Sequence, residues 1–421
     1  MNLTVGQKLL RFHWIAMLLM LSLSISGIFF IYSATHLSEM GLQHSARQQV
    51  IWLCIGLAAF FTLSLLDYEY LVQNGAFIFI GAVSVLIFVL AFGTEIKGAK
   101  SWIRFGGFSI QPAEFSKVAY VIGMTWFMLK MQDRIKDLLT LVILLAISII
   151  PVGLILAQPD FGSASVYGPI TYVMMVVAGI RKRYLFLPIL AIFAGITFAY
   201  FSIYKAEWKG TVQDIPRATV DGIIEAAPLI SLEEINNQQD TTQEQVDDED
   251  KVITLLKPYQ VNRIRTFFEP ELDPLGAGWT IRQSLIAVGS GGWQGKGYLK
   301  GDQNIYGFLP QDIAYNDFIF AVVAEEFGFF GGTGIIVGLA LLMLCIAQVA
   351  SRAKNYGGCL LAAGIGGMFF AHYLVNIGMT IKVVPITGIP LPLLSYGGTF
   401  LVTCLAGLGI VQSVWIHRRD Y

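Results

Sequence analysis

Ten stretches of about 20 mainly apolar residues constrain the fold of this 421-residue chain more than any other feature. A helix needs about that length to cross the hydrocarbon core of a bilayer, where unpaired backbone groups are not tolerated. Only 14% of the residues are charged, against about 25% in soluble proteins. The sequence therefore predicts an all-α polytopic membrane protein with ten transmembrane helices. The predicted spans are 13–33, 48–66, 72–93, 113–131, 137–156, 162–180, 184–204, 316–349, 357–381 and 396–416.

Two of these spans have unusual lengths or neighbours. The first follows Lys8 and Arg11, as a secretory signal would. Its apolar run is longer than a signal-peptide core and no small-x-small cleavage site follows, so we interpret it as a retained anchor. The eighth span is long enough to be tilted or broken. A group of glycines predicts a kink in it, namely Gly328, Gly331, Gly332 and Gly334.

The distribution of Lys and Arg predicts the orientation of the chain, because short cytoplasmic loops carry an excess of them. The long loop after the seventh span is left out, since long loops cross the membrane largely regardless of charge. The excess places both termini in the cytoplasm and the long loop outside the cytoplasmic (inner) membrane. The inner residues are Lys8, Arg11, Lys130, Arg134, Lys136, Arg181, Lys182, Arg183, Arg352, Lys354, Arg418 and Arg419, and the outer ones are Arg47, Lys97, Lys100, Arg104 and Lys382.

The outer loop covers about 205–315 of what we predict to be a single membrane domain. Its first part, 211–250, holds eleven acidic residues and one basic residue, Arg217. Such a composition is typical of a flexible, solvated insertion. From Lys257 onward, aromatic, glycine and charged residues are mixed. Chemistry on the outer face is expected in this second part.

Bulk charge and cysteine usage exclude other classes. Acidic and basic residues nearly cancel, with a net charge of −1, so nothing indicates a nucleic-acid partner. The four cysteines lie in apolar runs without metal-ligand spacing and are expected to be reduced, buried thiols. They are Cys54, Cys345, Cys359 and Cys404.

Charged residues in or beside the spans need a physical reason, because burying charge is costly. Pro112 suits the first turn of a helix, which places Glu114 and Lys117 one turn apart on one face. They form either a buried ion pair that locks two helices or part of a polar cavity open to the outside. Just upstream, Trp102 suits an interfacial aromatic belt as well as it suits substrate contact.

Two further segments have two interpretations or an unusual backbone. Asp160, in QPDFG, could be the N-cap of the sixth span or a site residue. Segment 385–398 reads PITGIPLPLLSYGG, and irregular backbone at membrane depth is tolerated only inside protein or beside a cavity. We therefore expect 385–398 to form one wall of a cavity.

The second part of the outer loop offers several carboxylates. Asp273 lies in a DPxGxG turn, where an aspartate often bonds to its own backbone. On chemistry alone, Glu269 and Glu271 are equal competitors for a catalytic role. Segment 279–288 has helical periodicity and is expected to lie along the membrane surface. Basic residues surround these acids: Arg263, Arg265, Arg282, Lys296 and Lys300.

Two adjacent carboxylates, Glu325 and Glu326, fall about two turns into the eighth span. They cannot both face lipid, so one is expected to be neutral or paired with Lys117 or Lys382.

Together these motifs resemble the SEDS family (shape, elongation, division and sporulation), and its rod-shape members more than its division members. The likeness covers nearly the whole chain. The motifs that carry it are GAKSWIRFGGFSIQPAEFSK, QPDFGSA, DPLGAGW, QSLIAVGSGGWQGKGYLKG, DFIFAVVAEEFG and GIPLPLLSYGG.

The resemblance implies a peptidoglycan glycosyltransferase that polymerises lipid II during cell elongation. It also implies a class B penicillin-binding protein as partner, besides the membrane lipids. Inversion at the anomeric carbon would need one displacement, with Asp273 as general base. The candidate substrate-binding residues are Trp102, Arg104, Glu114, Lys117, Asp160, Arg263, Lys296 and Ser395.

Some features depart from the family or leave alternatives open. The family's His-Thr pair before the eighth span is absent, since this chain reads LPQDIAYNDFIF from Leu309. No cofactor is required, although a divalent cation could help neutralise the departing pyrophosphate. A flippase for lipid-linked precursors and a non-catalytic scaffold for a penicillin-binding protein are the alternative functions.

Overall fold

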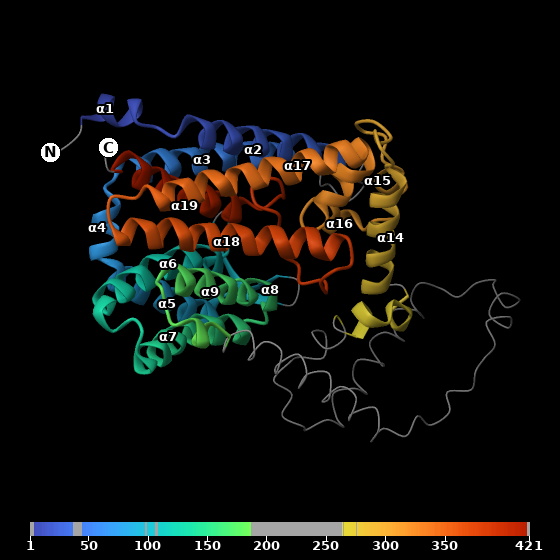
Figure 1. The fold of residues 1–421 in the computed structure, drawn as a ribbon. Helices are drawn as coiled ribbons and strands as arrows, with labels where there is room; N and C mark the ends of the chain where they lie inside the picture. Colours follow the sequence, from blue (N-terminus) through green and yellow to red (C-terminus); the bar gives the residue numbers. More distant parts are fainter. Residues whose placement is uncertain are drawn as a thin grey trace, which may run out of the picture. The chain divides into compact units, whose positions relative to one another are not determined.

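Helices running side by side make up most of the described chain (Figure 1). The structure is a computed structural model, and it describes residues 4–36, 44–96, 99–105, 108–186, 263, 265–274 and 276–418. All of these residues belong to one compact unit. The predicted seventh span, after residue 186, and the acidic insertion lie outside the described residues.

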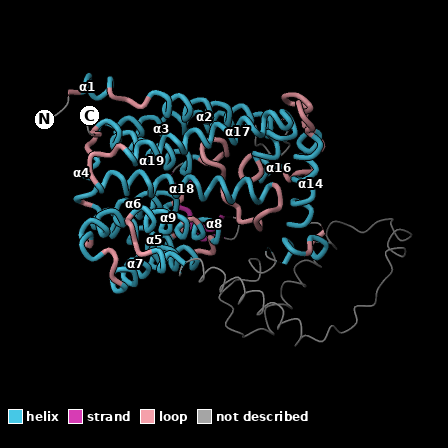
Figure 2. The backbone as a smooth tube through the Cα atoms, in the orientation of Figure 1, coloured by secondary structure: helices cyan, strands magenta, loops and turns pink. Residues whose placement is uncertain are grey.

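Figure 2 shows that most of the described backbone is helical and that loops join the helices. The helices are α1 Val5–Leu10, α2 Trp14–Thr35, α3 Ser45–Leu65, α4 Tyr68–Gln73, α5 Gly75–Phe92, α6 Pro112–Lys130, α7 Leu138–Ala157, α8 Phe161–Ser165, α9 Tyr167–Val177, α14 Ala277–Ser290, α15 Asp302–Ile305, α16 Gln311–Ala314, α17 Ile319–Ser351, α18 Tyr356–Thr380 and α19 Gly398–Ile416. Short 3₁₀ turns cover Gln132–Arg134 and Pro270–Leu272.

Seven helices within the described ranges are long and apolar enough to cross a membrane: α2, α3, α5, α7, α17, α18 and α19. The predicted fourth span corresponds to α6, and the sixth to the shorter pair α8 and α9. Large apolar side chains lie exposed on the outer surface of the bundle, as lipid contact requires. Examples are Leu18, Ile80, Phe88, Leu139 and Leu344.

A small antiparallel sheet corrects the all-helical expectation. Its strands are β1 Thr94–Ile96, β2 Ala99–Phe105 and β3 Phe108–Ile110, in the order β1-β2-β3. Trp102 pairs with Thr94, and Arg104 pairs with Ser109. The strands are too short and too rich in glycine turns to show a clear alternation in the sequence. The sheet leads directly into α6.

The interior of the bundle is formed by α18 and α19. Most of α18 and nearly all of α19 are buried, with α19 against α3 and α18 between α9 and α17. The predicted kink in α17 is confirmed at Gly328, whose φ of 62° lies in the left-handed region that glycine adopts without strain. The expectation that all cysteines are buried is wrong for Cys54, which is exposed on α3, and for the half-buried Cys359.

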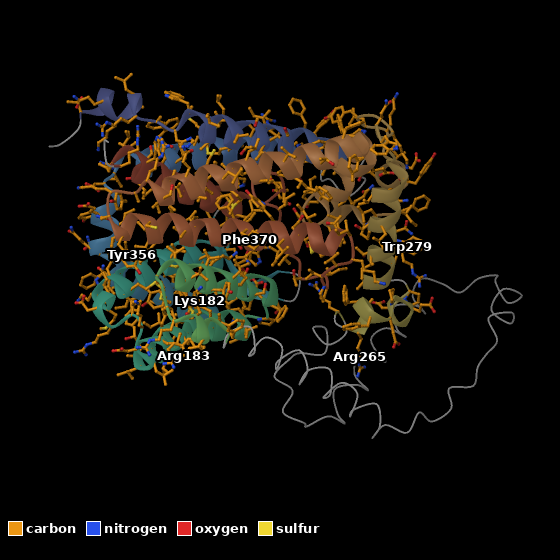
Figure 3. All side chains as sticks on the ribbon, viewed as in Figure 1. Lys182, Arg183, Arg265, Trp279, Tyr356 and Phe370 are labelled. Atoms are coloured by element: carbon orange, nitrogen blue, oxygen red, sulfur yellow. The ribbon has the colours of Figure 1, made fainter. Side chains whose placement is uncertain are left out.

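The two ends of the bundle differ. The described chain begins and ends at one of them, where the Arg418 guanidinium donates to the Arg11 carbonyl at 3.3 Å. At the other end, α14 runs across the ends of α17 and α18 (Figure 1). Trp279 lies on α14 and donates to the Phe308 carbonyl at 2.8 Å (Figure 3). The predicted helix at 279–288 is therefore confirmed, and it covers one end of the bundle.

Candidate functional site

A polar cavity of about 390 Å³ lies at the end of the bundle where α3, α6, α8 and α19 begin. Aromatic, amide and carboxylate side chains line it. Besides Glu114 and Lys117 they include Gln48, Trp52, Trp102, Gln111, Asp160 and Asp317. The starts of α3, α6 and α19 add partial positive charge to a lining that holds one ammonium, Lys117, and three carboxylates.

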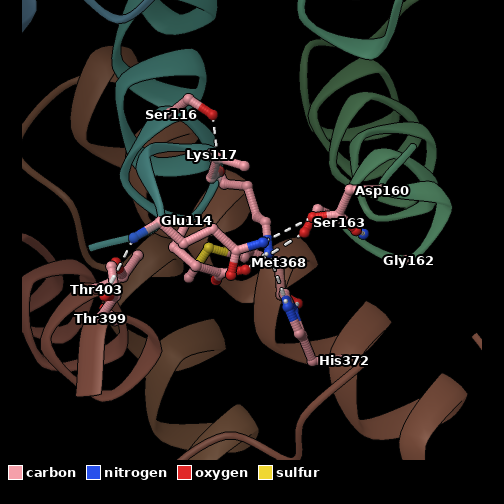
Figure 4. A network of polar contacts seen from close by, with 12 residues as sticks. Glu114, Ser116, Lys117, Asp160, Gly162, Ser163, Met368, His372, Thr399 and Thr403 are labelled. Carbon is pink, nitrogen blue, oxygen red and sulfur yellow. Dashed lines mark hydrogen bonds and ion pairs between the residues drawn. The ribbon is translucent and has the colours of Figure 1, made fainter. Parts of the chain in front are cut away.

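Lys117 is the buried cation of this cavity, and its side chain is 1% exposed (Figure 4). Its Nζ donates to the two carboxylate oxygens of Glu114, at 2.8 and 2.9 Å. Glu114 in turn accepts from the Ser163 hydroxyl at 3.5 Å. The predicted pairing on one helix face is confirmed. Both residues line the cavity, so the ion pair and the polar cavity are features of one structure.

His372 on α18 contacts Lys117, and the sequence did not predict this contact. It is fully buried, and its Nε2 lies 3.2 Å from Lys117 Nζ. An isolated histidine in an apolar span carries no local pattern, and 255 residues separate it from Lys117. Only the three-dimensional packing of α6 on α18 brings the two together.

Asp160 is the N-cap of α8, which is one of the two interpretations considered for it, and its side chain also lines the cavity. Its Oδ1 accepts from the backbone N–H of Ser163 at 2.9 Å, which caps α8. Its Oδ2 accepts from Gln111 Nε2 at 2.7 Å, and both side chains line the cavity. The bond to Ser163 holds the carboxylate in the lining of the cavity.

Segment 382–397 forms one wall, as predicted for 385–398, and side chains of neighbouring helices satisfy its backbone. Asn376 Nδ2 donates to the carbonyls of Asp317 and Ile389 at 2.8 and 2.7 Å. Gln49 Nε2 donates to the Ser395 carbonyl at 3.1 Å. The buried Ser395 hydroxyl donates to the Asn316 carbonyl and accepts from Leu391 N–H, so it holds the wall rather than lining the cavity.

Trp102, Arg104 and Arg263 occupy different places around the cavity. Trp102 is half-buried and lines it, whereas Arg104 on the same strand is exposed and is not among the lining residues. Arg263 donates to the Ile386 carbonyl at 3.5 Å, at the edge of the wall. A Cβ placed on Gly388 would lie 3.5 Å from Asp317 Oδ2 and 3.6 Å from Arg263 Nη1, so these two charged groups flank the same glycine.

Asp273 lies in the turn before α14. Its Oδ1 accepts from Gly276 N–H at 3.0 Å and its Oδ2 from Ala277 N–H at 2.9 Å. This is the turn arrangement that the DPxGxG sequence predicts. The half-exposed carboxylate is not among the residues that line the cavity.

Lys296 has two carboxylate partners away from the cavity. Its Nζ lies 2.6 Å from Glu325 Oε1 and 2.9 Å from Asp302 Oδ2. Burial lowers the pKa of Lys296, but hydrogen bonds and charge from Glu325 and Asp302 outweigh this effect, so the pKa is raised. Glu325 is therefore paired, but with Lys296 and not with Lys117 or Lys382, the two partners considered for it. Glu326 instead accepts from the Ser33 hydroxyl.

Chemically, the cavity offers a fixed ammonium for an anionic group, two indoles for a flat apolar face, and amides and carboxylates for hydroxyl groups. Among the described residues, no three His, Cys, Asp or Glu side chains gather as metal ligands. A multi-span membrane protein with a polar, cation-bearing cavity at one end of its bundle is the class that fold and site define.

Comparison with known proteins places the chain within that class. The family model of cell cycle proteins of the FtsW, RodA and SpoVE type matches residues 13–215 and 251–420. This chain therefore belongs to that family, the SEDS family.

Relatives and a solved structure agree with the assignment. The chain is 36% identical to the peptidoglycan glycosyltransferase RodA of Treponema pallidum, covering 96% of this chain and 97% of the relative. It is 30% identical to the peptidoglycan glycosyltransferase MrdB of Escherichia coli, covering 96% and 93%. A chain solved in work on how a peptidoglycan synthase complex coordinates polymerization and crosslinking matches with a TM-score of 0.70, 25% identity and coverage of 97% and 99%.

Proposed function

We propose that this protein is a peptidoglycan glycosyltransferase that polymerises lipid II into glycan strands during cell elongation. The observation that carries the proposal is the buried Lys117, held by Glu114 beside a polar cavity in a chain of this family. Burying a cation costs desolvation free energy, and a role in neutralising a pyrophosphate would explain why this chain carries one here.

Lipid II suits the position of the cavity. Its undecaprenyl tail belongs in lipid, and its disaccharide-peptide belongs in water, with the pyrophosphate between them. The cavity lies at one end of an apolar bundle, beside Trp52 and Trp102, whose indoles can stack on sugar rings. Lys117 is then placed for the pyrophosphate of the donor.

The proposed reaction is a single inverting displacement. The 4-hydroxyl of the acceptor sugar attacks the anomeric carbon of the donor, the bond from that carbon to the lipid pyrophosphate breaks, and a carboxylate takes the hydroxyl proton. We propose Asp273 as this general base, a role that usually increases the rate about 10²–10⁴-fold.

Asp273 caps α14 outside the cavity, so this role requires segment 265–274 to move toward the cavity when substrate binds. Arg263, at the start of the same stretch, already lies beside Gly388 at the cavity edge. A movement of the connecting turn is the step that this mechanism adds.

We further propose ten spans in the inner membrane, with both termini in the cytoplasm and the loop 205–315 outside. The distribution of Lys and Arg supports this orientation. A class B penicillin-binding protein is the proposed partner, on the strength of the likeness to a chain of a peptidoglycan synthase complex.

Purified protein in liposomes with labelled lipid II tests the proposal against both alternatives. We expect glycan chains without any flipping partner. Movement of lipid II between leaflets without polymer would favour a flippase. A failure of both activities, with a penicillin-binding protein still bound, would favour a scaffold.

A further inference from the structure

The protonation of His372 follows from its two partners. Nδ1 lies 2.8 Å from the Met368 carbonyl, and Nε2 lies 3.2 Å from Lys117 Nζ. A carbonyl can only accept a hydrogen bond, and an ammonium can only donate one. Nδ1 therefore carries the proton and Nε2 is the acceptor. His372 is a neutral imidazole with its lone pair directed at Lys117.

The surroundings of the ring fix this arrangement. His372 is fully buried, and its ring centroid lies 4.9 Å from that of Phe400, whose ring also lies 5.8 Å from Lys117 Nζ. The Met368 carbonyl, one turn earlier on α18, sets the orientation of the imidazole. A rotation of the ring would break both of its hydrogen bonds.

We propose that His372 is a positioning residue for the transfer reaction, which rests on the function proposed above. Glu114 on α6 and His372 on α18 hold the Lys117 ammonium from two helices. Glu114 alone would allow the long lysine side chain to pivot about the carboxylate. The imidazole removes that freedom and keeps Nζ at the cavity, where the pyrophosphate develops charge.

A pair of nearly isosteric substitutions tests the hydrogen bond itself. In His372→Gln, the amide oxygen occupies nearly the place of Nε2 and can accept from Lys117. In His372→Met, a side chain of similar length offers only a weakly accepting thioether. Thermal unfolding in detergent of both variants reports their folding.

We expect His372→Met to lower kcat for lipid II polymerisation by about 10- to 100-fold, the value of one hydrogen bond to a charged group. KM should stay within about twofold, because the bond acts on charge that develops in the transition state. His372→Gln should recover most of kcat. A folded Met variant with wild-type kcat, or a folded Gln variant as slow as the Met variant, overturns the proposal.

A second measurement does not depend on the activity. Nitrogen NMR of ring-labelled histidine, with the His372 signals assigned from their loss in His372→Gln, should show a proton on Nδ1 and none on Nε2. A proton on Nε2 overturns the positioning role. An inactive wild-type protein with the expected tautomer would contradict the proposed function and leave the Lys117–His372 bond established.

Discussion

At the scale of the residue, Lys117 and Glu114 form a unit whose members depend on each other. Each is nearly fully buried, at 1% and 5% side-chain exposure, and the ammonium contacts both carboxylate oxygens. Removing one partner leaves the other charge buried without a counter-ion, which strongly destabilises the folded protein. Replacing both partners by apolar residues costs much less free energy. The effect of a single substitution therefore mixes stability with chemistry.

A double substitution separates the two. We expect Lys117→Met to destabilise the protein by about 3–5 kcal/mol, because Glu114 is left buried without its counter-ion. Adding Glu114→Gln should restore most of the melting temperature, because the residual charge is removed. Polymerisation should stay lost in the double variant, since no cation faces the pyrophosphate. A double variant that polymerises lipid II like the wild type would show that the pair is structural only.

The sequence predicted local contacts at the residue scale and missed distant ones. Glu114 and Lys117 are three residues apart on one helix, so helical geometry alone pairs them. Lys296 and Glu325 meet across 29 residues, and Lys117 and His372 across 255. A single sequence does not show how distant helices align with each other, so it cannot predict such pairs.

At the scale of the element, segment 382–397 and the start of α19 give the cavity its shape. The segment includes three residues with positive φ: Lys382 at 57°, Gly388 at 74° and Leu393 at 70°. Left-handed backbone is costly for the lysine and the leucine, and strain of this kind concentrates at functional sites. Side chains from α3 and α18 hold the segment in place.

Gly398, the first residue of α19, tests this element. A Cβ there would lie 2.0 Å from Trp52 Cε2, so Gly398→Ala must displace an indole that lines the cavity. We expect a loss of about 1–3 kcal/mol in stability and a clear fall in activity. In Gly407→Ala, the matched control further along α19, the new methyl group would make only ordinary contacts, the nearest at 3.4 Å. Equal effects of the two substitutions would refute a specific role for the contact with Trp52.

Apolar runs, Pro112 and Gly328 predicted the helices and the kink because each acts locally. The sheet from 94 to 110 was not predicted, since its short strands are stabilised by pairing with one another and by the helices they join. The sequence located the cavity wall through its prolines and glycines, but not which side chains face the cavity.

In the whole molecule, the two ends of the bundle carry different elements. The end with both described termini holds contacts between Arg11, Arg418 and Trp415. The opposite end holds the sheet, the cavity and α14. The proposed orientation places the substrate chemistry at the outer surface of the cytoplasmic membrane.

Single-cysteine labelling tests the orientation. In a cysteine-free background, Tyr306→Cys, exposed in the outer loop, should react with an impermeant maleimide in spheroplasts. Gln132→Cys, exposed in the turn after α6, should react only after the membrane is opened. The reverse pattern would place the cavity on the cytoplasmic side and would contradict the proposed function, because glycan strands are needed outside the cytoplasmic membrane.

The proposed mechanism requires a carboxylate of this chain to remove the proton when two sugars are joined. Asp273→Asn removes the group that takes up the proton, and it keeps one of the two hydrogen bonds at the start of α14, because the amide oxygen of asparagine accepts but its nitrogen does not. Glu271→Gln makes the same chemical change two residues away, on a side chain that is 90% exposed.

The direct measurement is therefore glycan synthesis from purified lipid II by the wild type, Asp273→Asn and Glu271→Gln. We predict chains from the wild type and from Glu271→Gln, and none from an Asp273→Asn protein that still unfolds cooperatively in a thermal melt. Chains from Asp273→Asn at a near wild-type rate would contradict the role of Asp273 as the general base.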